Sequence, residues 1–450
     1  MNFISIEFLF FIIIVLSIYW LANDKLKKYI LIFASLLFCY TYGLEKLEYL
    51  LIYVFASFVL GKYINKNFYS LSFSIILCLF PLVLAKYFDF SILGISFISF
   101  RAISFIVDKY NGKIDEIDVF DYILYLLFFP TFLSGPIEKS KTFIKQINTK
   151  KQITWNKFVE AVIIITYGIL LKIVIADNLI LVINEIYNYL GFYRIYSLIA
   201  VVLYSIYIYC DFYGYSRIAY GLGMLFGYNL NINFKQPYLS TSIKEFWNTW
   251  HTSLGEWLNE YIYIPLGGNR KGLLRKYINI LVVFIASGIW HGNTLNFVLW
   301  GLINGLIRVI EEIVDNRYRT NNKILKTLRI IVTDTLICLT WTFFALDFNG
   351  VIKLFSSLLL PSTLNIERIF KTIMLSVSLD TIEIVLIIVS MLIMIIVDIL
   401  SKNNICVSNI ISNSNIVIRY VALLAMIIVI IVAGRYGLEY NSASFIYMGF

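Results

Sequence analysis

Long apolar stretches recur from one end of the chain to the other, and they restrict its fold more than any other feature. Hydrophobic residues make up 60% and charged residues 14% of the 450 positions, a balance that one soluble core cannot accommodate. We expect helices in residues 4–22, 29–40, 49–61, 71–87, 92–107, 122–133, 159–175, 196–210, 278–289, 295–310, 325–344, 382–400 and 416–432. Several stretches are shorter than the roughly 20 residues that cross a bilayer, so some are expected to be re-entrant or broken. The sequence therefore predicts an all-α polytopic membrane protein with about a dozen transmembrane and re-entrant helices.

The distribution of basic residues predicts the orientation of these helices. The first apolar stretch has no basic residue before it and is followed by "NDKLKK", so we expect an uncleaved span whose N-terminus lies outside. Lysine and arginine also gather in residues 138–157, 235–276 and 308–329, which we expect on the cytoplasmic side. The net charge of +9 follows from this distribution. It favours contact with anionic membrane lipids, whereas no soluble basic face for nucleic acid is visible.

The five cysteines do not indicate a disulfide framework or a zinc site. Their number is odd, and they are scattered, mostly within apolar stretches: Cys39, Cys78, Cys210, Cys338 and Cys406. We expect most of them to be small packing residues. The sequence accordingly predicts no metal and no tightly bound cofactor.

The chain has two histidines, His251 and His291, and each directly follows a tryptophan. The first lies in "FWNTWHTSLGEWLNEYIYIPLGGNRKG", which begins at Phe246. Steps of three and four residues predict one amphipathic helix at the membrane interface, with this apolar face: Trp247, Trp250, Leu254, Trp257 and Tyr261. Pro265 is expected to end that helix. The glycine-rich basic turn that follows is either a cytoplasmic cap or a turn that brings backbone N–H groups and basic side chains to phosphate.

His291 lies at the end of an apolar run, in "SGIWHGNTLNFVLWG". Ionisable residues at membrane depth are costly and tend to be functional, and an imidazole can exchange a proton near neutral pH as a general base must. The alternative is a hydrogen bond between helices. Gly288 and Gly292 flank the Trp-His pair, so the backbone there can approach a ligand or a neighbouring helix closely.

The two histidine segments together resemble the signature region of the membrane-bound O-acyltransferase superfamily, in particular its bacterial branch of alginate and other polysaccharide O-acetyltransferases. Further blocks are similar to that branch in the same order: "LGISFISFRAISFIVDKYNGKI", "FFPTFLSGPIEK", "LLKIVIADNL", "YCDFYGYSRIAYGLGMLFGYN" and "FIYMGF". They extend over residues 94–450, nearly the whole chain. The resemblance implies an acyltransferase domain over residues 1–433, with the helices around a central tunnel.

By this resemblance, His291 is the general base or proton shuttle for acyl transfer from a thioester to a hydroxyl, and His251 is a second essential residue of the same tunnel. The implied donor is acetyl-coenzyme A or an acyl carrier protein. The residues expected to bind the donor are Asn269, Arg270, Lys271, Trp250 and Trp290. The implied acceptor is a cell-envelope or extracellular polysaccharide, modified from the bacterial cytoplasmic membrane. The implied partner is an SGNH-type transferase on the extracytoplasmic side of that membrane.

The last residues, 434–450, are predicted to form an extracytoplasmic tail because little positive charge follows the final apolar stretch. Its end, "FIYMGF", resembles a C-terminal acyl-relay motif, in which Tyr447 would carry the acyl group. A phenol with a pKa near 10 needs a base for that role, and His291 could supply one. The alternative is an interfacial aromatic anchor.

Two other functions remain open from the sequence. Within the same family, D-alanyl transfer to teichoic acid from a carrier protein is the nearest alternative, and "YIPLGGNR" favours the acetylating branch. A transporter or flippase would also have many spans and a few buried polar residues, but the sequence shows no inverted repeat. The paired Trp-His motifs favour the acyltransferase over the transporter.

Overall fold

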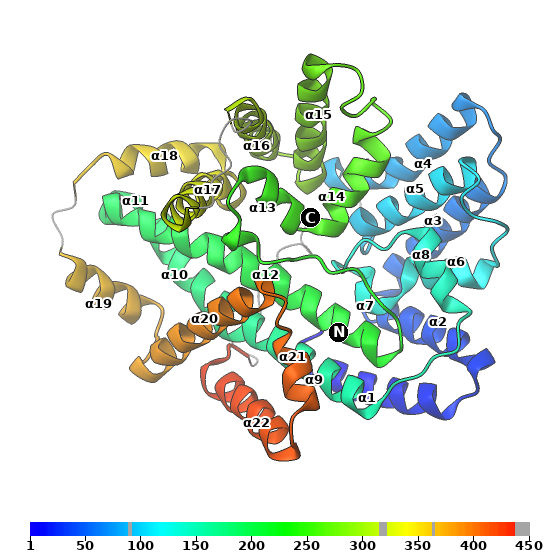
Figure 1. Ribbon diagram of the computed structural model, residues 1–450, viewed down its shortest axis with the longest axis horizontal. Helices are drawn as coiled ribbons and strands as arrows, with labels where there is room; N and C mark the ends of the chain where they lie inside the picture. The colour runs from blue at the N-terminus through cyan, green and yellow to red at the C-terminus, as the bar shows by residue number, and fades with distance from the viewer. Residues whose placement is uncertain (89–91, 315–321, 362–364, 437–450) are drawn as a thin grey trace. The chain divides into compact units, whose positions relative to one another are not determined.

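The computed structural model describes residues 1–88, 92–314, 322–361 and 365–436, and in these ranges the regular structure is entirely helical (Figure 1). Each apolar stretch predicted above contains helix. Seven of the described helices are long and apolar enough to cross a membrane: Phe68–Tyr87, Trp155–Asn188, Leu190–Leu225, Leu273–His291, Lys323–Ala345, Thr381–Lys402 and Ile416–Ala433. The prediction of an all-α, multi-pass membrane protein is therefore confirmed.

Contacts divide the chain into two compact units. Among the described residues, unit 1 contains 1–165 with 216–232, and unit 2 contains 166–215 with the chain from residue 233 onward. The border falls inside α9 (Trp155–Leu170) and inside α12 (Leu198–Leu225). The last helix, α22 (Ile416–Ala433), ends where the predicted tail begins, but Tyr447 and the rest of 437–450 lie outside the described residues.

Unit 1 consists of the N-terminal helices: α1 (Ile6–Leu21), α2 (Asp24–Tyr40), α3 (Leu44–Lys62), α4 (Phe68–Tyr87), α5 (Ile95–Tyr110), α6 (Val119–Leu127), α7 (Phe129–Phe132) and α8 (Ser140–Ile147). Its centre is α5, where Arg101 is 1% exposed. The Arg101 guanidinium donates to the carbonyl oxygens of Thr131 (2.9 Å) and Pro136 (3.0 Å). Thr131 lies in α7 and Pro136 lies just after it, so these bonds satisfy buried carbonyls where the short helix ends.

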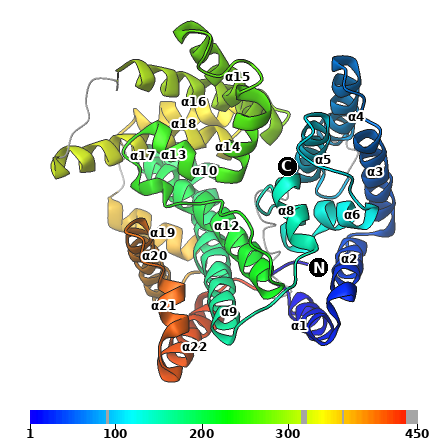
Figure 2. The same ribbon diagram turned by 45° about the vertical axis from the view of Figure 1, so that its right-hand side comes forward.

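Unit 2 contains most of the remaining helices: η1 (Leu171–Ala176), α10 (Asp177–Asn188), α11 (Leu190–Tyr193), η2 (Arg194–Ser197), η3 (Pro237–Leu239), α13 (Ile243–Thr249), α14 (Thr252–Leu258), η4 (Asn259–Tyr263), α15 (Leu273–His291), α16 (Leu295–Val314), α17 (Lys323–Ala345), α18 (Phe348–Leu358), α19 (Ile366–Ser376), α20 (Thr381–Lys402), α21 (Val407–Asn413) and α22. Helices α13 to α17 gather in one region of this unit, as both views show (Figure 2). Both histidines lie in this region.

A buried ionic triad joins two segments of unit 2. The Lys172 ammonium, in the π-helical turn η1, lies 2.6 Å from a carboxylate oxygen of Asp211 and 2.9 Å from one of Asp177. All three side chains are fully buried. Removing one partner from such a group leaves an uncompensated charge in an apolar interior, so the triad fixes η1 against α12.

The antiparallel pair α15 and α16 packs unusually closely because glycines line the contact. A Cβ atom at Gly288 would lie 2.2 Å from the Phe297 carbonyl oxygen, and one at Gly301 would lie 2.4 Å from that of Phe284. Small residues allow this approach between membrane helices. We call this pair the glycine hairpin; it carries His291 on one helix and Trp300 on the other.

Candidate functional site

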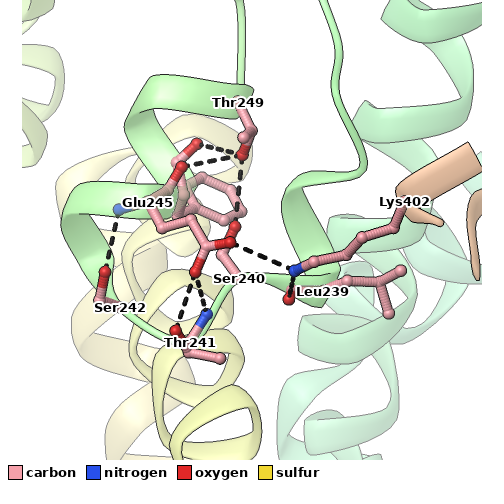
Figure 3. Close-up of polar contacts among 8 residues, drawn as sticks. Leu239, Ser240, Thr241, Ser242, Glu245, Thr249 and Lys402 are labelled. Atoms are coloured by element: carbon pink, nitrogen blue, oxygen red, sulfur yellow. Dashed lines mark hydrogen bonds and ion pairs between the residues drawn. The ribbon is translucent and has the colours of Figure 1, made fainter. Parts of the chain in front are cut away.

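The short helix α13 leads into the first histidine and is held at its start by a polar network (Figure 3). The Glu245 carboxylate accepts hydrogen bonds from the backbone N–H (2.7 Å) and the hydroxyl (2.9 Å) of Thr241, and pairs with Lys402 at 3.2 Å. The Ser242 hydroxyl caps the helix by accepting from the Glu245 N–H. Burial would raise the pKa of the Glu245 carboxyl, but the Thr241 bonds and the Lys402 charge outweigh it, so the pKa lies below its usual value.

The predicted single helix from Trp247 to Tyr261 is wrong, because the chain breaks at Trp250 and His251. Helix α13 ends at Thr249 and α14 begins at Thr252. His251 between them has φ +45°, a left-handed conformation that is rare for residues other than glycine. Such local strain occurs at functional sites and persists only where the surroundings enforce it.

The segment around Asn233 enforces this break by pairing with both sides of it. The Lys235 N–H donates to the Thr249 carbonyl (2.9 Å), and the Thr252 N–H donates to the Asn233 carbonyl (2.9 Å). The Ser253 hydroxyl donates to the Asn233 side-chain oxygen at 2.6 Å. We call these three bonds the Asn233 clamp; together they fix the backbone before and after the histidine.

His251 is 2% exposed and lies among aromatic rings. Its ring centroid is 4.7 Å from that of Phe212 and 6.3 Å from that of Trp290. It lies outside the seven candidate spans, and burial lowers the pKa of its imidazole to about 3. His251 is therefore neutral at physiological pH, as a group that accepts a proton or a hydrogen bond must be.

His291 is 3% exposed at the C-terminal end of α15. Its ring centroid lies 4.8 Å from that of Trp290, 5.3 Å from Trp300 and 4.9 Å from Phe344. Both histidines thus contact the same Trp290 ring. The structure therefore places the two Trp-His motifs next to each other.

Trp250 belongs to the same aromatic cluster as the histidines. It is 3% exposed, and its ring lies 5.0 Å from that of Trp341. Trp341 in turn contacts Phe344, which contacts His291. The structure therefore brings together four of the residues predicted from the sequence: His251, His291, Trp250 and Trp290.

The three predicted donor-binding residues Asn269, Arg270 and Lys271 lie elsewhere, on an exposed turn. The turn follows η4 and depends on Gly267, Gly268 and Gly272, which have φ of +103°, +55° and +87°. The Asn279 side chain on α15 donates to the Gly268 carbonyl at 2.9 Å, which fixes the turn to that helix.

The structure adds residues that the sequence did not single out. Phe212 follows Asp211 of the ionic triad, so the charge pairing of α12 also positions a ring against His251. Asn233 and Trp300 are two further residues of this kind. Trp300 lies within the motif "SGIWHGNTLNFVLWG", whereas no local pattern around Asn233 indicated its bond to Ser253. In the described residues, no three His, Cys, Asp or Glu side chains form a group that could hold a metal ion.

Comparison with known proteins gives a consistent result. Residues 8–348 match the membrane-bound O-acyltransferase family, a range that includes both histidines. A protein of Pseudomonas fluorescens named as a probable alginate O-acetylase is 34% identical over 253 residues, 56% of this chain and 50% of the relative. The peptidoglycan O-acetyltransferase of Helicobacter pylori is 34% identical over 233 residues, 50% of this chain and 43% of the relative.

A third relative, the teichoic acid D-alanyltransferase of Streptococcus thermophilus, is 29% identical over 282 residues, 57% of this chain and 66% of the relative. The chain spans about half the length of the alginate O-acetylase relatives that it matches.

Proposed function

The chain belongs to the membrane-bound O-acyltransferase family, and from that premise we propose that it transfers an acetyl group from a cytoplasmic thioester to a cell-envelope polysaccharide. The relatives named for alginate and peptidoglycan O-acetylation support this reaction. The enzyme would work in the bacterial cytoplasmic membrane, with a donor on one side and an acceptor on the other.

The observation that carries the proposal is that both buried histidines lie close to the Trp290 ring, with centroid distances of 6.3 Å for His251 and 4.8 Å for His291. In the reaction, His291 takes the proton of the acceptor hydroxyl as the oxygen attacks the thioester carbonyl carbon. The neutral His251 supplies a second hydrogen-bonding group in the same cluster. General-base assistance of this kind is worth about 10² to 10⁴ in rate.

Acetyl-coenzyme A is the proposed donor. Its phosphates would bind the turn that carries Arg270 and Lys271, whose exposed basic side chains and backbone N–H groups suit phosphate. Trp250 and Trp290 would contact the acyl end of the donor within the aromatic cluster.

We further propose that Tyr447 accepts the acetyl group and that an extracytoplasmic SGNH-type transferase then passes it to the sugar.

D-alanyl transfer to teichoic acid is the second candidate. The D-alanyltransferase relative supports it, since the match extends over two thirds of that protein. Its identity to this chain is lower, 29% against 34% for the acetylating relatives. The donor separates the two candidates, because D-alanine arrives on a carrier protein.

A reconstitution with two donors tests the proposal. The full chain in lipid nanodiscs is given either radiolabelled acetyl-coenzyme A or D-alanyl carrier protein as the donor. Membrane-derived glycan fragments are added as acceptors. We expect label from acetyl-coenzyme A in ester linkage, either on Tyr447 of the chain or on the glycan, and none with the His291→Ala variant. Transfer from the D-alanyl carrier alone would assign the second candidate, and transfer from neither donor would contradict both.

A further inference from the structure

Trp300 lies beside His291, and neither the sequence nor the proposed reaction gives it a role. Its ring centroid is 5.3 Å from that of His291, and the two planes are nearly perpendicular, at 85°. The side chain is 2% exposed. The glycine hairpin fixes this contact, because Gly301 next to Trp300 leaves no room for a shift against α15.

The indole Nε1–H of Trp300 is a buried donor with no hydrogen-bond acceptor in the described part of the chain. An indole N–H can only donate, and burying it without an acceptor costs about 1–3 kcal/mol. A phenylalanine would occupy the same aromatic environment, beside Phe344 at 4.9 Å and Trp341 at 5.8 Å, without that cost. Packing therefore explains the ring of Trp300 but not its N–H group.

Acyl transfer creates an acceptor at this place. When a hydroxyl whose proton goes to His291 attacks the thioester carbon, that carbon must lie within reach of the imidazole. The carbonyl oxygen attached to it then lies in the first layer of side chains around His291, to which Trp300 belongs. Negative charge grows on this oxygen, and a fixed donor stabilises it most strongly where water is excluded.

We propose that the Trp300 indole N–H is an oxyanion donor of the acyl transfer. The inference rests on the proposed function. The hydroxyl oxygen forms a bond to the carbonyl carbon, its proton moves to His291, and the carbonyl π electrons move to oxygen, where Nε1–H donates a hydrogen bond. The carbonyl then re-forms, the carbon–sulfur bond breaks, and the leaving thiolate takes the proton from His291.

Trp341 offers a matched control in the same cluster. It is 1% exposed and stacks on Trp300 with an interplanar angle of 21°. It is not among the ring contacts of His291 in the described chain. Changing either tryptophan to phenylalanine keeps a ring in place and removes an N–H, so a packing effect should be similar for the two variants.

The experiment compares Trp300→Phe and Trp341→Phe in the reconstituted full chain with acetyl-coenzyme A. We expect Trp300→Phe to lower kcat by about 10²- to 10³-fold with little change in the donor KM, as for loss of an oxyanion donor. Trp341→Phe should lower kcat less than tenfold. Thermal melting of both variants should fall by similar amounts.

A wild-type kcat in Trp300→Phe, or an equal loss in both variants, would contradict the oxyanion role and leave the proposed function intact. Absence of turnover by the wild type with either donor would contradict the proposed function and, with it, this inference.

A second readout does not need turnover. In ultraviolet resonance Raman spectra, the indole band that reports N–H bonding should shift when a non-hydrolysable ketone analogue of acetyl-coenzyme A is added to wild type. An unshifted band with the analogue bound would contradict the inference.

Discussion

The two histidines are held in place by different physical means, and the comparison shows how one site can be rigid in two ways. The backbone of His251 is strained and is held by hydrogen bonds, the Asn233 clamp. The backbone of His291 belongs to the regular helix α15 and is held by close contact between glycines and backbone. Polar pairing fixes a break in the chain, whereas small-residue packing fixes a continuous helix. The two positions should therefore respond differently to substitution.

The largest effect is expected from the imidazoles themselves. His291→Ala should reduce acyl transfer by about 10²- to 10⁴-fold, because the general base is lost, while the protein stays folded and inserted. His251→Ala should also lose most activity. Turnover of reconstituted protein with labelled acetyl-coenzyme A measures both. A folded His291→Ala variant that keeps more than about a tenth of wild-type activity would rule out general-base catalysis of this size.

The glycine hairpin can be tested with one added methyl group. Gly288→Ala places a Cβ atom 2.2 Å from the Phe297 carbonyl, so α15 and α16 must separate. We expect a destabilisation of about 1–3 kcal/mol, the usual range for overpacking, and a displaced His291. Gly255→Ala in α14 is the control, because its Cβ would have an ordinary contact of 3.7 Å with the Trp247 carbonyl. Equal melting temperatures for the two variants would disprove this account of the hairpin.

Removing the Asn233 clamp should have a smaller effect, and it should lower turnover more than stability. Asn233→Ala removes the acceptor of the Ser253 hydroxyl, a bond worth about 0.5–1.5 kcal/mol, so kcat should fall about tenfold or less with the donor KM nearly unchanged. Ser253→Ala should have a similar effect. The double variant should be no worse than either single one, since both remove the same bond. Additive losses would show that the two side chains act independently.

The His251 environment also predicts a dependence of stability on pH. The imidazole pKa is about 3 in the folded protein, below the usual value near 6.5 in an unfolded chain. The unfolded state therefore binds more protons between these two pH values, and stability is lost as pH falls below about 6.5, by at most about 1.4 kcal/mol per pH unit. Melting curves at pH 7.5 and 5.5 measure this loss, which should be smaller in His251→Asn. An identical pH dependence in that variant would assign the loss to other groups.

The smallest effect is expected at the basic turn, outside the aromatic cluster. Arg270→Ala should raise the KM for acetyl-coenzyme A severalfold and change kcat little, as for a contact made in both ground and transition states. Arg368→Ala, an exposed arginine on α19, is the control for loss of one positive charge. If the two variants have the same donor kinetics, the turn does not bind the donor, and its basic residues serve only to orient this segment in the membrane.

The sequence predicted the helices well because burial in a bilayer leaves long apolar stretches that are visible along the chain. It failed at the break between Trp250 and His251. The steps of three and four residues from Trp247 to Tyr261 continue across that break, and no glycine or proline marks it. The bonds that produce it come from Asn233, a partner outside the local pattern.

The candidate site could be predicted in part for a similar reason. Histidine is rare in this chain, so each one was conspicuous, and both lie on Trp290 in the structure. Trp300 was not conspicuous, because an aromatic residue in an apolar helix is equally typical of a surface that faces lipid. Only the three-dimensional contact with His291 distinguishes it. The turn after Pro265 was predicted correctly, since residues 264–271 form a turn, and the positive φ of Gly267 and Gly268 shows why glycines stand there.

The ionic triad has a consequence for how the protein is made. Lys172 and Asp177 enter the bilayer within one apolar segment, Trp155–Asn188, and can neutralise each other there. Asp211 enters on the next segment, Leu190–Leu225, and a solitary aspartate near the centre of a span raises the insertion free energy by about 2.5–3.5 kcal/mol. The Lys172 already in the membrane offers it a counter-ion at 2.6 Å. Insertion of the second segment is therefore favoured by prior insertion of the first. The ribosome synthesises the two segments in this order, so the counter-ion of Asp211 is already in the bilayer when Asp211 enters it.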